Sequence, residues 1–471
     1  MDGLECCERN KTSLEEGVRF DSELYQRKYA LLEDFAKTHN MTTFSKEAST
    51  VKKGIFDISA SCYSSSGIPF VRISNLKGMF LSQNDLVYIP EEENEKNVET
   101  QLVKGDIILS KTGSPAASYV SFDTCNASQD TVAIKLKPSS QIVSGYVVVY
   151  LNTVYGLAQM EKRFTGNIQK HLNLDDCKRN LLIPVFCEEL QNKTQKLLLA
   201  SLHDSEVANQ LYKDAQDIFQ AQLTIPKIPK QSEAILSLNK SFKRSGRLDA
   251  EYYQPKYMTF YECLQKFRAT TIPSEYYVFK NVGSNYAEGT SDVGVIKTKQ
   301  LSNDGINLDG IESYFDSQVC IDNKSTFLQN NDVVFAAMGV GSLGKVSLFS
   351  HDGAEKYVTD STLRIYRAKP SCKIRPEVLC VFLQSQIGQE LIYRYVVGST
   401  GIINIYDDDM AKIPIPVLDD AIQEEIAAKV QESFALQKQA KQLLEHAKQA
   451  VEMAIERGEE LALEWLKDKV G

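Results

Sequence analysis

The sequence lacks a hydrophobic run long enough to cross a lipid bilayer, because no stretch of about 18 apolar residues occurs in it. Its first residues include Glu5 and Glu8 but no apolar core segment, so they do not resemble a secretory signal. Together these absences predict a cytoplasmic protein that makes no contact with a membrane.

Motifs for metal binding and redox chemistry are also missing. The ten cysteines include no Cys-x-x-Cys pair, so neither a zinc knuckle nor a redox-active pair is indicated, and we expect all ten to be reduced thiols. The five histidines are scattered and form no cluster. We therefore expect no metal site and no cofactor.

Catalytic motifs are absent as well. The sequence has no Asn-Pro-Pro-Tyr/Phe or Asp-Pro-Pro-Tyr element for amino-methyl transfer and no Gly-x4-Gly-Lys-Ser/Thr phosphate loop. Residues 339–344 (GVGSLG) match Gly-x-Gly-x-x-Gly, but they lack the alternating strand and helix context of a dinucleotide site. These absences indicate a protein without enzymatic activity of its own.

The net charge of −9 argues weakly against a protein coated in nucleic acid, because phosphate binding requires Lys and Arg. Much of the acid lies in helical surfaces and in residues 91–95 (EEENE), so an acidic total is compatible with a basic groove. With 43% hydrophobic and 24% charged residues, the composition is that of an ordinary globular protein.

The dominant feature of the sequence is an internal repeat. Residues 247–257 (RLDAEYYQPKY) repeat residues 19–29 (RFDSELYQRKY) with seven of eleven positions identical, at an offset of 228 residues. Later landmarks recur in the same order, at offsets of about 225 to 235: residues 71–76 with 296–301, 104–113 with 330–339, 130–134 with 360–365, 165–168 with 400–403, and 182–185 with 413–417. The sequence therefore predicts two copies of one unit.

Each unit is predicted to be an α+β domain. It opens with a short amphipathic helix, which begins at Pro255 in the second copy. Segments of alternating polarity then predict strands at residues 70–76, 85–89, 106–110 and 131–136, and at 293–298, 332–336, 345–349 and 362–366. Apolar residues at three-to-four spacing predict one helix over residues 143–160 and another over 376–395.

Two long helices are predicted where Gly and Pro are absent, over residues 188–223 and 420–457. Both carry heptad spacing with alanines on the seam, which favours a close antiparallel pair, and each would be roughly 54 Å long. The predicted organisation is domain 1 over residues 1–187, the first helix over 188–223, a linker and domain 2 over 224–420, and the second helix over 421–471. The pair would be a coiled-coil-like spacer, and the two domains would be related by a pseudo-twofold axis.

This organisation resembles the specificity (S) subunit of type I restriction-modification systems, and the resemblance covers nearly the whole chain. It is carried by the Asp-x-Glu-x-Tyr element of both copies, by residues 104–113 (KGDIILSKTG) and 165–172 (TGNIQKHL), and by the Ile-Pro elements at 183–184 and 413–416 that enter the long helices. The order and duplication of these motifs make the combination specific.

The resemblance implies a non-catalytic subunit that recognises double-stranded DNA through two tandem target recognition domains. Each domain would read one half of a split sequence. The helices would hold the halves apart and dock two DNA methyltransferase (M) subunits and, through them, restriction (R) subunits.

Polar and basic residues in loops near strand ends are the candidates for DNA contact, because recognition needs base-edge donors and acceptors together with phosphate anchors. In the first domain they are Arg72, Asn75, Lys77, Lys111, Thr112, Ser114, Asn167, Gln169, Lys170 and His171. In the second domain they are Lys297, Lys299, Gln300, Ser342, Lys345, Ser399, Thr400 and Asn404.

Other interpretations remain open on the sequence alone. Each candidate could be a solvated loop residue, and the long helices could form an intermolecular coiled coil. The duplicated fold could serve a scaffold or an anti-phage adaptor that reads no sequence. An enzyme with a site between the domains is a further alternative, to be tested by activity of the isolated chain.

Overall fold

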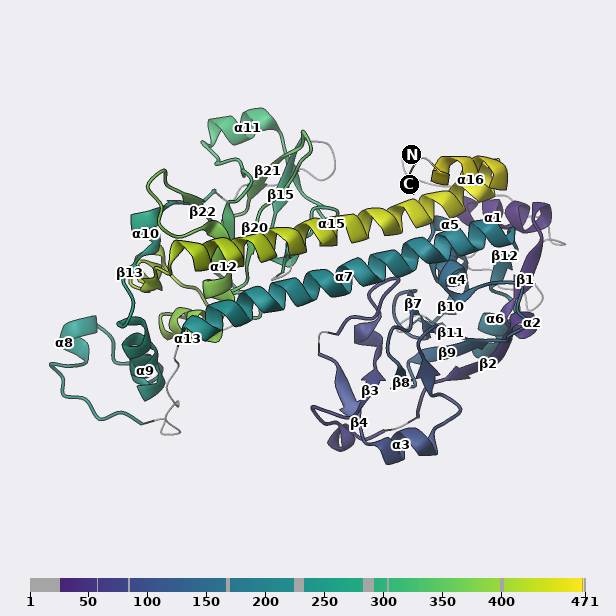
Figure 1. Cartoon of the computed structure of the whole chain (residues 1–471), viewed down its shortest axis with the longest axis horizontal. Coiled ribbons are helices and arrows are strands. Elements are labelled where there is room, and N and C mark those ends of the chain that lie inside the picture. Colours follow the sequence, from purple (N-terminus) through teal and green to yellow (C-terminus); the bar gives the residue numbers. More distant parts are fainter. Residues whose placement is uncertain are drawn as a thin grey trace. The chain divides into compact units, whose positions relative to one another are not determined.

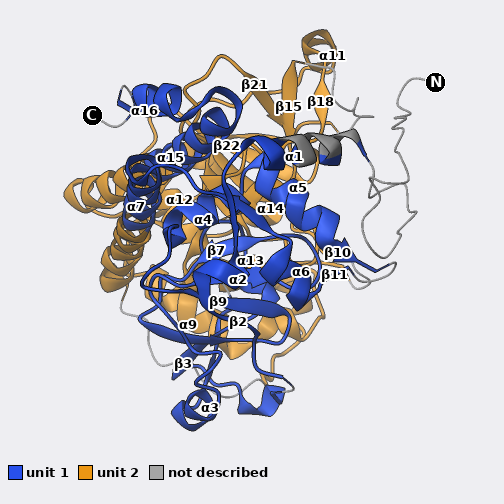
Figure 2. Cartoon of the chain, turned by 90° about the vertical axis from the view of Figure 1, so that its right-hand side faces the viewer, with its two compact units in different colours: residues 1–205, 438–471 blue, residues 206–437 orange. Residues whose placement is uncertain are grey.

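The computed structural model describes residues 26–56, 58–83, 85–166, 170–223, 233–282, 292–302, 305–398, 402–467 and 469. The chain forms two compact units, coloured separately in Figure 2. Unit 1 comprises Met1–Ser205 with Lys438–Gly471, and unit 2 comprises Glu206–Gln437. Each unit combines helices with several small sheets, which confirms the predicted mixture of helix and strand (Figure 1).

Unit 1 is built mainly from short strands that precede a group of helices. Its elements are α1 (Arg27–Thr38), β1 (Met41–Thr43), α2 (Phe44–Glu47), β2 (Ala48–Lys53), β3 (Ile68–Val71), β4 (Val87–Ile89), α3 (Glu91–Lys96), β5 (Leu102–Val103), β6 (Ile107–Ser110), β7 (Ala117–Tyr119), β8 (Thr124–Ala127), β9 (Thr131–Leu136), α4 (Ser144–Leu151), α5 (Val154–Arg163), β10 (Phe164–Thr165), β11 (His171–Leu172), α6 (Leu174–Arg179) and β12 (Leu182–Pro184).

The main sheet of unit 1 is antiparallel, with strand order β2-β9-β6-β7. Its inner strand β6 has the sequence Ile-Ile-Leu-Ser and is buried throughout, as expected for apolar residues covered on both faces. A second sheet, β4-β3-β8-β5, contains a parallel pair, β3 with β8. β1 pairs separately with β12.

Helix α4 joins the core of unit 1 to β12. Tyr146 and Tyr150 are fully buried, and their hydroxyls donate to the carbonyls of Pro184 (2.8 Å) and Leu182 (3.0 Å). Burial raises the pKa of both phenols. Both hydroxyls therefore stay protonated and can donate at physiological pH.

Unit 2 contains a similar succession of elements. They are α8 (Phe242–Ser245), α9 (Pro255–Leu264), β13 (Ala269–Thr270), α10 (Ile272–Glu275), β14 (Tyr276–Phe279), β15 (Val293–Ile296), β16 (Leu301–Ser302), β17 (Gly305–Ile306), β18 (Tyr314–Phe315), α11 (Ser317–Asp322), β19 (Val333–Ala336), β20 (Val346–Leu348), β21 (Lys356–Thr359), β22 (Leu363–Ala368), α12 (Pro376–Gln384), α13 (Gln386–Arg394), α14 (Asp407–Met410) and β23 (Ile415–Pro416).

The main sheet of unit 2 is also antiparallel, with order β14-β22-β19-β20. A second sheet, β18-β15-β21, contains the parallel pair β15 with β21. β13 pairs with β23. The predicted helix at Pro255 is confirmed, because Pro255 is the first residue of α9 and Tyr257, Phe260 and Leu264 are buried.

The long helices α7 (Glu188–Gln222) and α15 (Asp420–Arg457) pack on each other, as predicted (Figure 1). Within unit 1, Ser201 Oγ donates to the carbonyl of Ala440 (2.8 Å). Within unit 2, Ser433 Oγ donates to the carbonyl of Ala208 (2.7 Å). Alanines on both seams are buried, which permits the close approach of the backbones.

A short helix, α16 (Glu459–Lys467), follows α15 after Gly458 and belongs to unit 1. The Glu459 carboxylate accepts a hydrogen bond from the backbone N–H of Cys187 (2.7 Å), directly before α7. Ala462 and Leu466 of α16 are fully buried in the same hydrophobic core as Leu190 and Leu197 of α7.

A buried carboxylate connects α2 with the segment after β9 in unit 1. Glu47 accepts hydrogen bonds from Thr42 Oγ1 (2.7 Å), from the N–H of Gln141 (2.8 Å) and from Ser140 Oγ (2.9 Å). Burial by itself raises the pKa of the Glu47 carboxyl, but these hydrogen bonds, with Lys137 nearby, bring it below the ordinary value of 4.5. Glu47 is therefore ionised at neutral pH.

Two helix predictions are wrong. Residues 143–160 form two helices, α4 and α5, and residues 376–395 form α12 and α13. Each break has the same cause: the hydroxyl of Thr153 or Ser385 accepts the backbone N–H of a glycine three residues later and so starts a new helix. The apolar spacing continues through both breaks and therefore conceals them.

Several strand predictions are too long, among them those for β3, β4, β15 and β20. Strands β3 and β15 end at Val71 and Ile296, and the predicted remainders form 3-10 turns at Ile73–Asn75 and Thr298–Gln300. The predicted strand 131–136 coincides with β9. Residues 19–25 of the first opening motif lie outside the described residues, as do Asn167, Gln169, Ser399 and Thr400 of the candidate site.

Among the described residues, the cysteines from Cys62 to Cys380 are free thiols. In the same part of the chain, no helix combines the length and the apolar character needed to cross a membrane.

Candidate nucleic-acid interface

The structure brings part of the unit 1 candidates together at the end of β6. The loop that follows β6 pairs with the β10–β11 hairpin: Thr112 forms a backbone bridge with His171, and the Gly113 N–H donates to the Lys170 carbonyl (3.1 Å). On the other side, the Leu172 N–H donates to the Lys111 carbonyl (2.8 Å). Residues far apart in sequence thus form one surface.

The side chains on this surface differ in exposure. Ser114, Lys170 and His171 are exposed, Lys111 is half-buried and Thr112 is buried. Ser110, the last residue of β6, stabilises this loop, because its hydroxyl donates to the Ser114 carbonyl (2.8 Å). Exposed donors on a rigid loop are suited to contact phosphates and base edges.

Unit 2 has the same arrangement at the end of β19. The Gly339 N–H donates to the Ile403 carbonyl (2.9 Å), and Met338 forms a backbone bridge with Asn404. Asn404 also pairs with Val397 through two backbone hydrogen bonds of 2.9 Å, so the described residues 397–398 and 402–404 belong to the two arms of a hairpin, called the 397–404 hairpin below. In this pairing, Asn404 occupies the position in unit 2 that His171 occupies in unit 1, because His171 pairs with Thr112 and Asn404 pairs with Met338.

Ser342 and Lys345 lie in the loop beside this hairpin. Both are half-buried, and their backbone N–H groups are engaged: that of Ser342 donates to Gly339 and that of Lys345 to Ser342. The loop contains three glycines with positive φ, at 339, 341 and 344. It is a compact turn that is held by α13 (Gln386–Arg394), since Gln389 Nε2 donates to the Gly344 carbonyl (2.9 Å).

A second group of candidates lies after β3 and β15, where the side-chain amides are not available to DNA. Asn75 is fully buried; its Oδ1 accepts from the N–H of Arg72 (3.0 Å) and its Nδ2 donates to the Ser82 carbonyl (3.1 Å). Gln300 is 4% exposed, and it likewise accepts from the N–H of Lys297 (3.1 Å). Both amides support the turn instead of facing solvent.

The basic residues around these amides remain nearer the surface. Lys77 is exposed, and Lys299 is exposed but paired with Glu312. Lys297 Nζ donates to Ser313 Oγ (2.7 Å).

Arg72 lines a cavity of about 320 Å³ in unit 1, together with Tyr63, Ser74 and the turn Ser128–Asp130. Its Nε is buried and has no hydrogen-bond partner among the described residues, while its terminal nitrogen donates to the Asp85 carbonyl. A buried guanidinium N–H without an acceptor is costly unless a ligand supplies one. Arg72 is therefore a good candidate for a phosphate or base-edge contact.

The turn Ser128–Asp130 belongs to this surface but was not predicted as part of the site. This turn connects the two groups of unit 1, because the Asp130 carbonyl accepts from the N–H of Lys111 (2.8 Å) and the Ser128 N–H donates to Val71 (2.9 Å). The sequence did offer a signal for this turn, because it directly precedes β9, a strand that was predicted with its observed bounds. Across the described residues, no His, Cys, Asp and Glu group has the arrangement needed to hold a metal ion.

Comparison with known proteins gives one family match. Residues 280–446 match the model of the type I restriction modification DNA specificity domain. This segment includes β19, its following loop and the 397–404 hairpin. No curated protein matches the chain.

The chain is also similar to solved structures at low identity. The S subunit of a type I restriction-modification system from M. genitalium is 12% identical, with 89% of this chain and 96% of that one covered and a TM-score of 0.42. The HsdS subunit from Thermoanaerobacter tengcongensis is 12% identical over 89% and 97%, with a TM-score of 0.28. A chain from a study of complex assembly and conformational transition of the type I R-M system is 14% identical over 89% and 98%, with a TM-score of 0.29.

The family match falls on the unit 2 loop and hairpin whose backbone pairing is described above. Residues 280–446 of this chain thus match the type I restriction modification DNA specificity domain, which agrees with the resemblance found in the sequence.

Proposed function

We propose that this chain is the sequence-specific DNA-recognition subunit of a type I restriction-modification complex. The match of residues 280–446 to the DNA specificity domain carries the proposal. In this function the chain binds DNA and directs a methyltransferase to its target, and it performs no catalysis itself.

We propose further that units 1 and 2 are copies of one another. The equal strand orders β2-β9-β6-β7 and β14-β22-β19-β20 support this, as does the parallel pair in each second sheet. Side-chain details recur too: Gln191 and Gln423 are both buried amides, and they accept the backbone N–H of Val143 (3.1 Å) and Arg375 (3.0 Å).

The two helix bonds support a pseudo-twofold relation between α7 and α15. Ser201 and Ser433 are 232 residues apart, and so are Ala208 and Ala440. In one bond the donor is on α7 and the acceptor on α15; in the other bond the roles are exchanged. Such an exchange between equivalent positions is expected for elements related by a twofold axis. We propose for this scheme the boundaries expected from the sequence, with domains over 1–187 and 224–420 and helices over 188–223 and 421–471.

Each copy would read one half of a bipartite DNA target with its strand-end loop and hairpin. In unit 1, Arg72, Lys77, Lys170 and His171 present donors for phosphates and base edges, and in unit 2 Asn404 occupies the position of His171. Asn75 and Gln300 would act as supports, because their amides are already hydrogen-bonded within the domain.

The proposed partners follow from this function. They are double-stranded DNA, two methyltransferase (M) subunits docked on the α7–α15 pair and, through them, restriction (R) subunits. Such a complex acts on cellular DNA and would be cytoplasmic.

The test is methylation by the reconstituted complex. We expect the full chain, purified with its methyltransferase, to direct methylation to one bipartite sequence with a spacer of several base pairs. Each correct base pair should contribute about 1–3 kcal/mol over a mismatch, or roughly 5- to 150-fold in preference. A complex without sequence preference at physiological salt would refute the proposal.

Single substitutions then separate the two half-sites. His171→Ala should relax preference at one half-site and Asn404→Ala at the other, because the two residues occupy equivalent positions in different units. Gln265→Ala, at an exposed amide directly after α9 and outside the residues proposed to contact DNA, is the control and should change neither. Equal loss at both half-sites from either variant would contradict the assignment of one half-site to each unit.

A further inference from the structure

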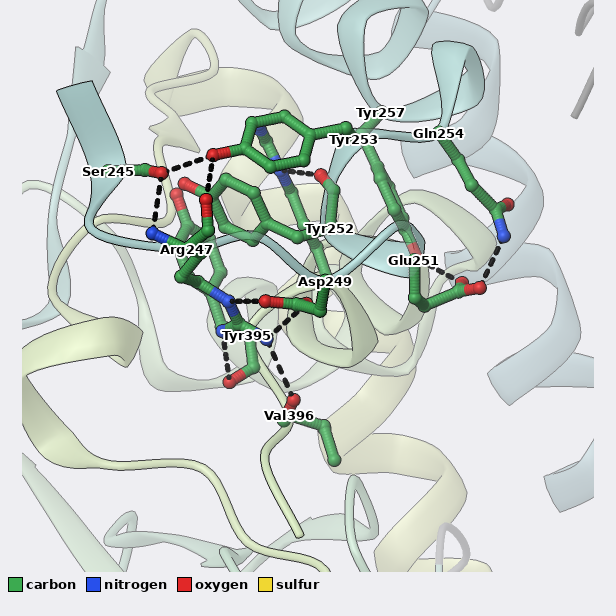
Figure 3. Close-up of polar contacts among 11 residues, drawn as sticks. Ser245, Arg247, Asp249, Glu251, Tyr252, Tyr253, Gln254, Tyr257, Tyr395 and Val396 are labelled. Atoms are coloured by element: carbon green, nitrogen blue, oxygen red, sulfur yellow. Dashed lines mark hydrogen bonds and ion pairs between the residues drawn. The ribbon is translucent and has the colours of Figure 1, made fainter. Parts of the chain in front are cut away.

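The opening motif of unit 2 makes no contribution to the DNA surface proposed above, yet its side chains form a dense polar cluster (Figure 3). The Arg247 guanidinium forms a two-point ion pair with Asp249, through Nε to Oδ1 (2.8 Å) and NH2 to Oδ2 (2.7 Å). It also lies over the ring of Tyr252, 4.7 Å from the centroid. These contacts fix the plane of the guanidinium.

The remaining donors of Arg247 are directed at the end of α13. NH1 donates to the carbonyl of Tyr395 and NH2 to that of Val396, both at 3.3 Å. These residues directly follow the last residue of α13, Arg394, where carbonyls lack helical partners and the helix dipole is negative. Arg247 therefore holds the chain as it leaves the helix.

The ring of Tyr395 is held as firmly as its backbone. Its hydroxyl is 2.8 Å from that of Tyr261, and its ring meets that of Tyr252 edge-on at 5.6 Å. The Arg394 guanidinium lies within 4.8 Å of the ring centroids of both Tyr252 and Tyr261. Burial raises the pKa of both the Tyr395 and Tyr261 phenols, so both are neutral at physiological pH.

The 397–404 hairpin begins directly after Val396. Val397 follows Val396 and pairs with Asn404 through two backbone hydrogen bonds. The opposite arm is attached to the loop after β19, where the N–H of Gly339 donates to the Ile403 carbonyl. One arm of the hairpin is thus fixed by the sheet and the other by Arg247.

We propose that Arg247 and Asp249 are positioning residues that set the orientation of the 397–404 hairpin, and so determine sequence discrimination at the half-site read by unit 2 without touching DNA. This inference rests on the proposed function. It gives the repeated Arg-x-Asp-x-Glu-x-Tyr motif a role, since a motif placed before each domain would orient the hairpin near that domain's end.

A direct contact between Arg247 and a DNA phosphate is the competing explanation. The side chain of Arg247 is only 20% exposed. Its four hydrogen bonds occupy four of the roughly five N–H groups that a guanidinium offers. Little donor capacity remains for a phosphate.

The experiment uses the full chain in complex with its methyltransferase and compares R247A, R247K and the exchange variant R247D/D249R. R244A is the control, because Arg244 is an exposed arginine of α8, three residues before Arg247. Methylation is measured on DNA libraries varied in one half-site at a time, and amide hydrogen exchange is measured over residues 396–405 without DNA.

We expect R247A, R247K and R247D/D249R each to lose about tenfold in discrimination at the unit 2 half-site, to keep discrimination at the other half-site, and to exchange faster over residues 396–405. R247K retains the charge but not the planar fork, and the exchange variant retains an ion pair but not the donors to residues 395 and 396. R244A should match the wild type in both measurements.

Wild-type behaviour of R247K would overturn the proposal, because charge alone would then suffice. Equal loss at both half-sites would also overturn it, since the defect would then be global. If the wild type shows no bipartite preference, the proposed function fails. The hold of Arg247 on the 397–404 hairpin is then tested by hydrogen exchange alone: faster exchange over residues 396–405 in R247A supports it, and unchanged exchange refutes it.

Discussion

The break between α4 and α5 provides a sharp test of the fold, through the substitution Gly156→Ala. A Cβ at this position would lie 2.2 Å from the Tyr150 carbonyl oxygen and 2.4 Å from the Leu151 Cα. An ordinary carbon–oxygen contact is about 3.3 Å, so the overlap is about 1 Å and involves backbone atoms that cannot rotate away.

The magnitude combines three effects. Overpacking costs about 1–3 kcal/mol, and displacement of α5 would break the Thr153 cap, which is worth about 1 kcal/mol. Alanine regains about 1 kcal/mol through its higher helix propensity. We therefore expect a net loss of roughly 1–3 kcal/mol, opposite in sign to Gly→Ala in an unobstructed helix.

Urea denaturation followed by the fluorescence of Trp465 measures this loss. Trp465 is the only tryptophan of the chain and packs against the core of unit 1. Val154→Ala, at a 64% exposed position of the same helix, is the control and should change the midpoint little. An unchanged or higher midpoint for Gly156→Ala would refute the packing argument.

Three further outcomes are expected. The free energy of unfolding of unit 1 should fall as the pH drops below about 4.5, because the pKa of Glu47 is lowered in the fold and its ionised carboxylate stabilises the fold only above that pH. Urea titrations between pH 3 and 6, roughly the span of carboxyl titration, should show a flatter pH dependence for Glu47→Gln. Ser201→Ala should cost about 1 kcal/mol by Trp465 fluorescence, since it removes the bond to Ala440, and no loss would show that the bond is dispensable. Arg367→Ala should lower the free energy of unfolding by about 3 kcal/mol, because it leaves the buried Asp332 carboxylate without its ion-pair partner, and the thermal midpoint measured by circular dichroism should fall accordingly. Arg367→Ala combined with Asp332→Asn should lose less stability.

The most accurate predictions from the sequence concern elements whose residue pattern lies within one continuous segment. Strand β9 and helix α15 have the predicted bounds, because β-branched residues specify the strand and the absence of Gly and Pro, ended by Gly458, specifies the helix. The breaks at Thr153 and Ser385 were missed because a capping hydroxyl leaves the apolar period intact.

The candidate site was harder to predict, since exposure depends on partners distant in sequence. Asn75 and Gln300 had the composition of base readers, yet their amides bond to Ser82 and to Gly310. No local signal distinguishes such an amide from one that faces solvent. The pairing of Thr112 with His171, 59 positions later, likewise arises only when the sheet forms.

The participation of α16 in unit 1 has a consequence for biosynthesis. The first unit shares its core with Ala462 and Leu466, and Glu459 completes the start of α7, so unit 1 cannot complete its core until residues 459–466 have been synthesised. A chain that stops before Glu459 would therefore leave the core of unit 1 incomplete, although every residue of its first strands and helices had been made.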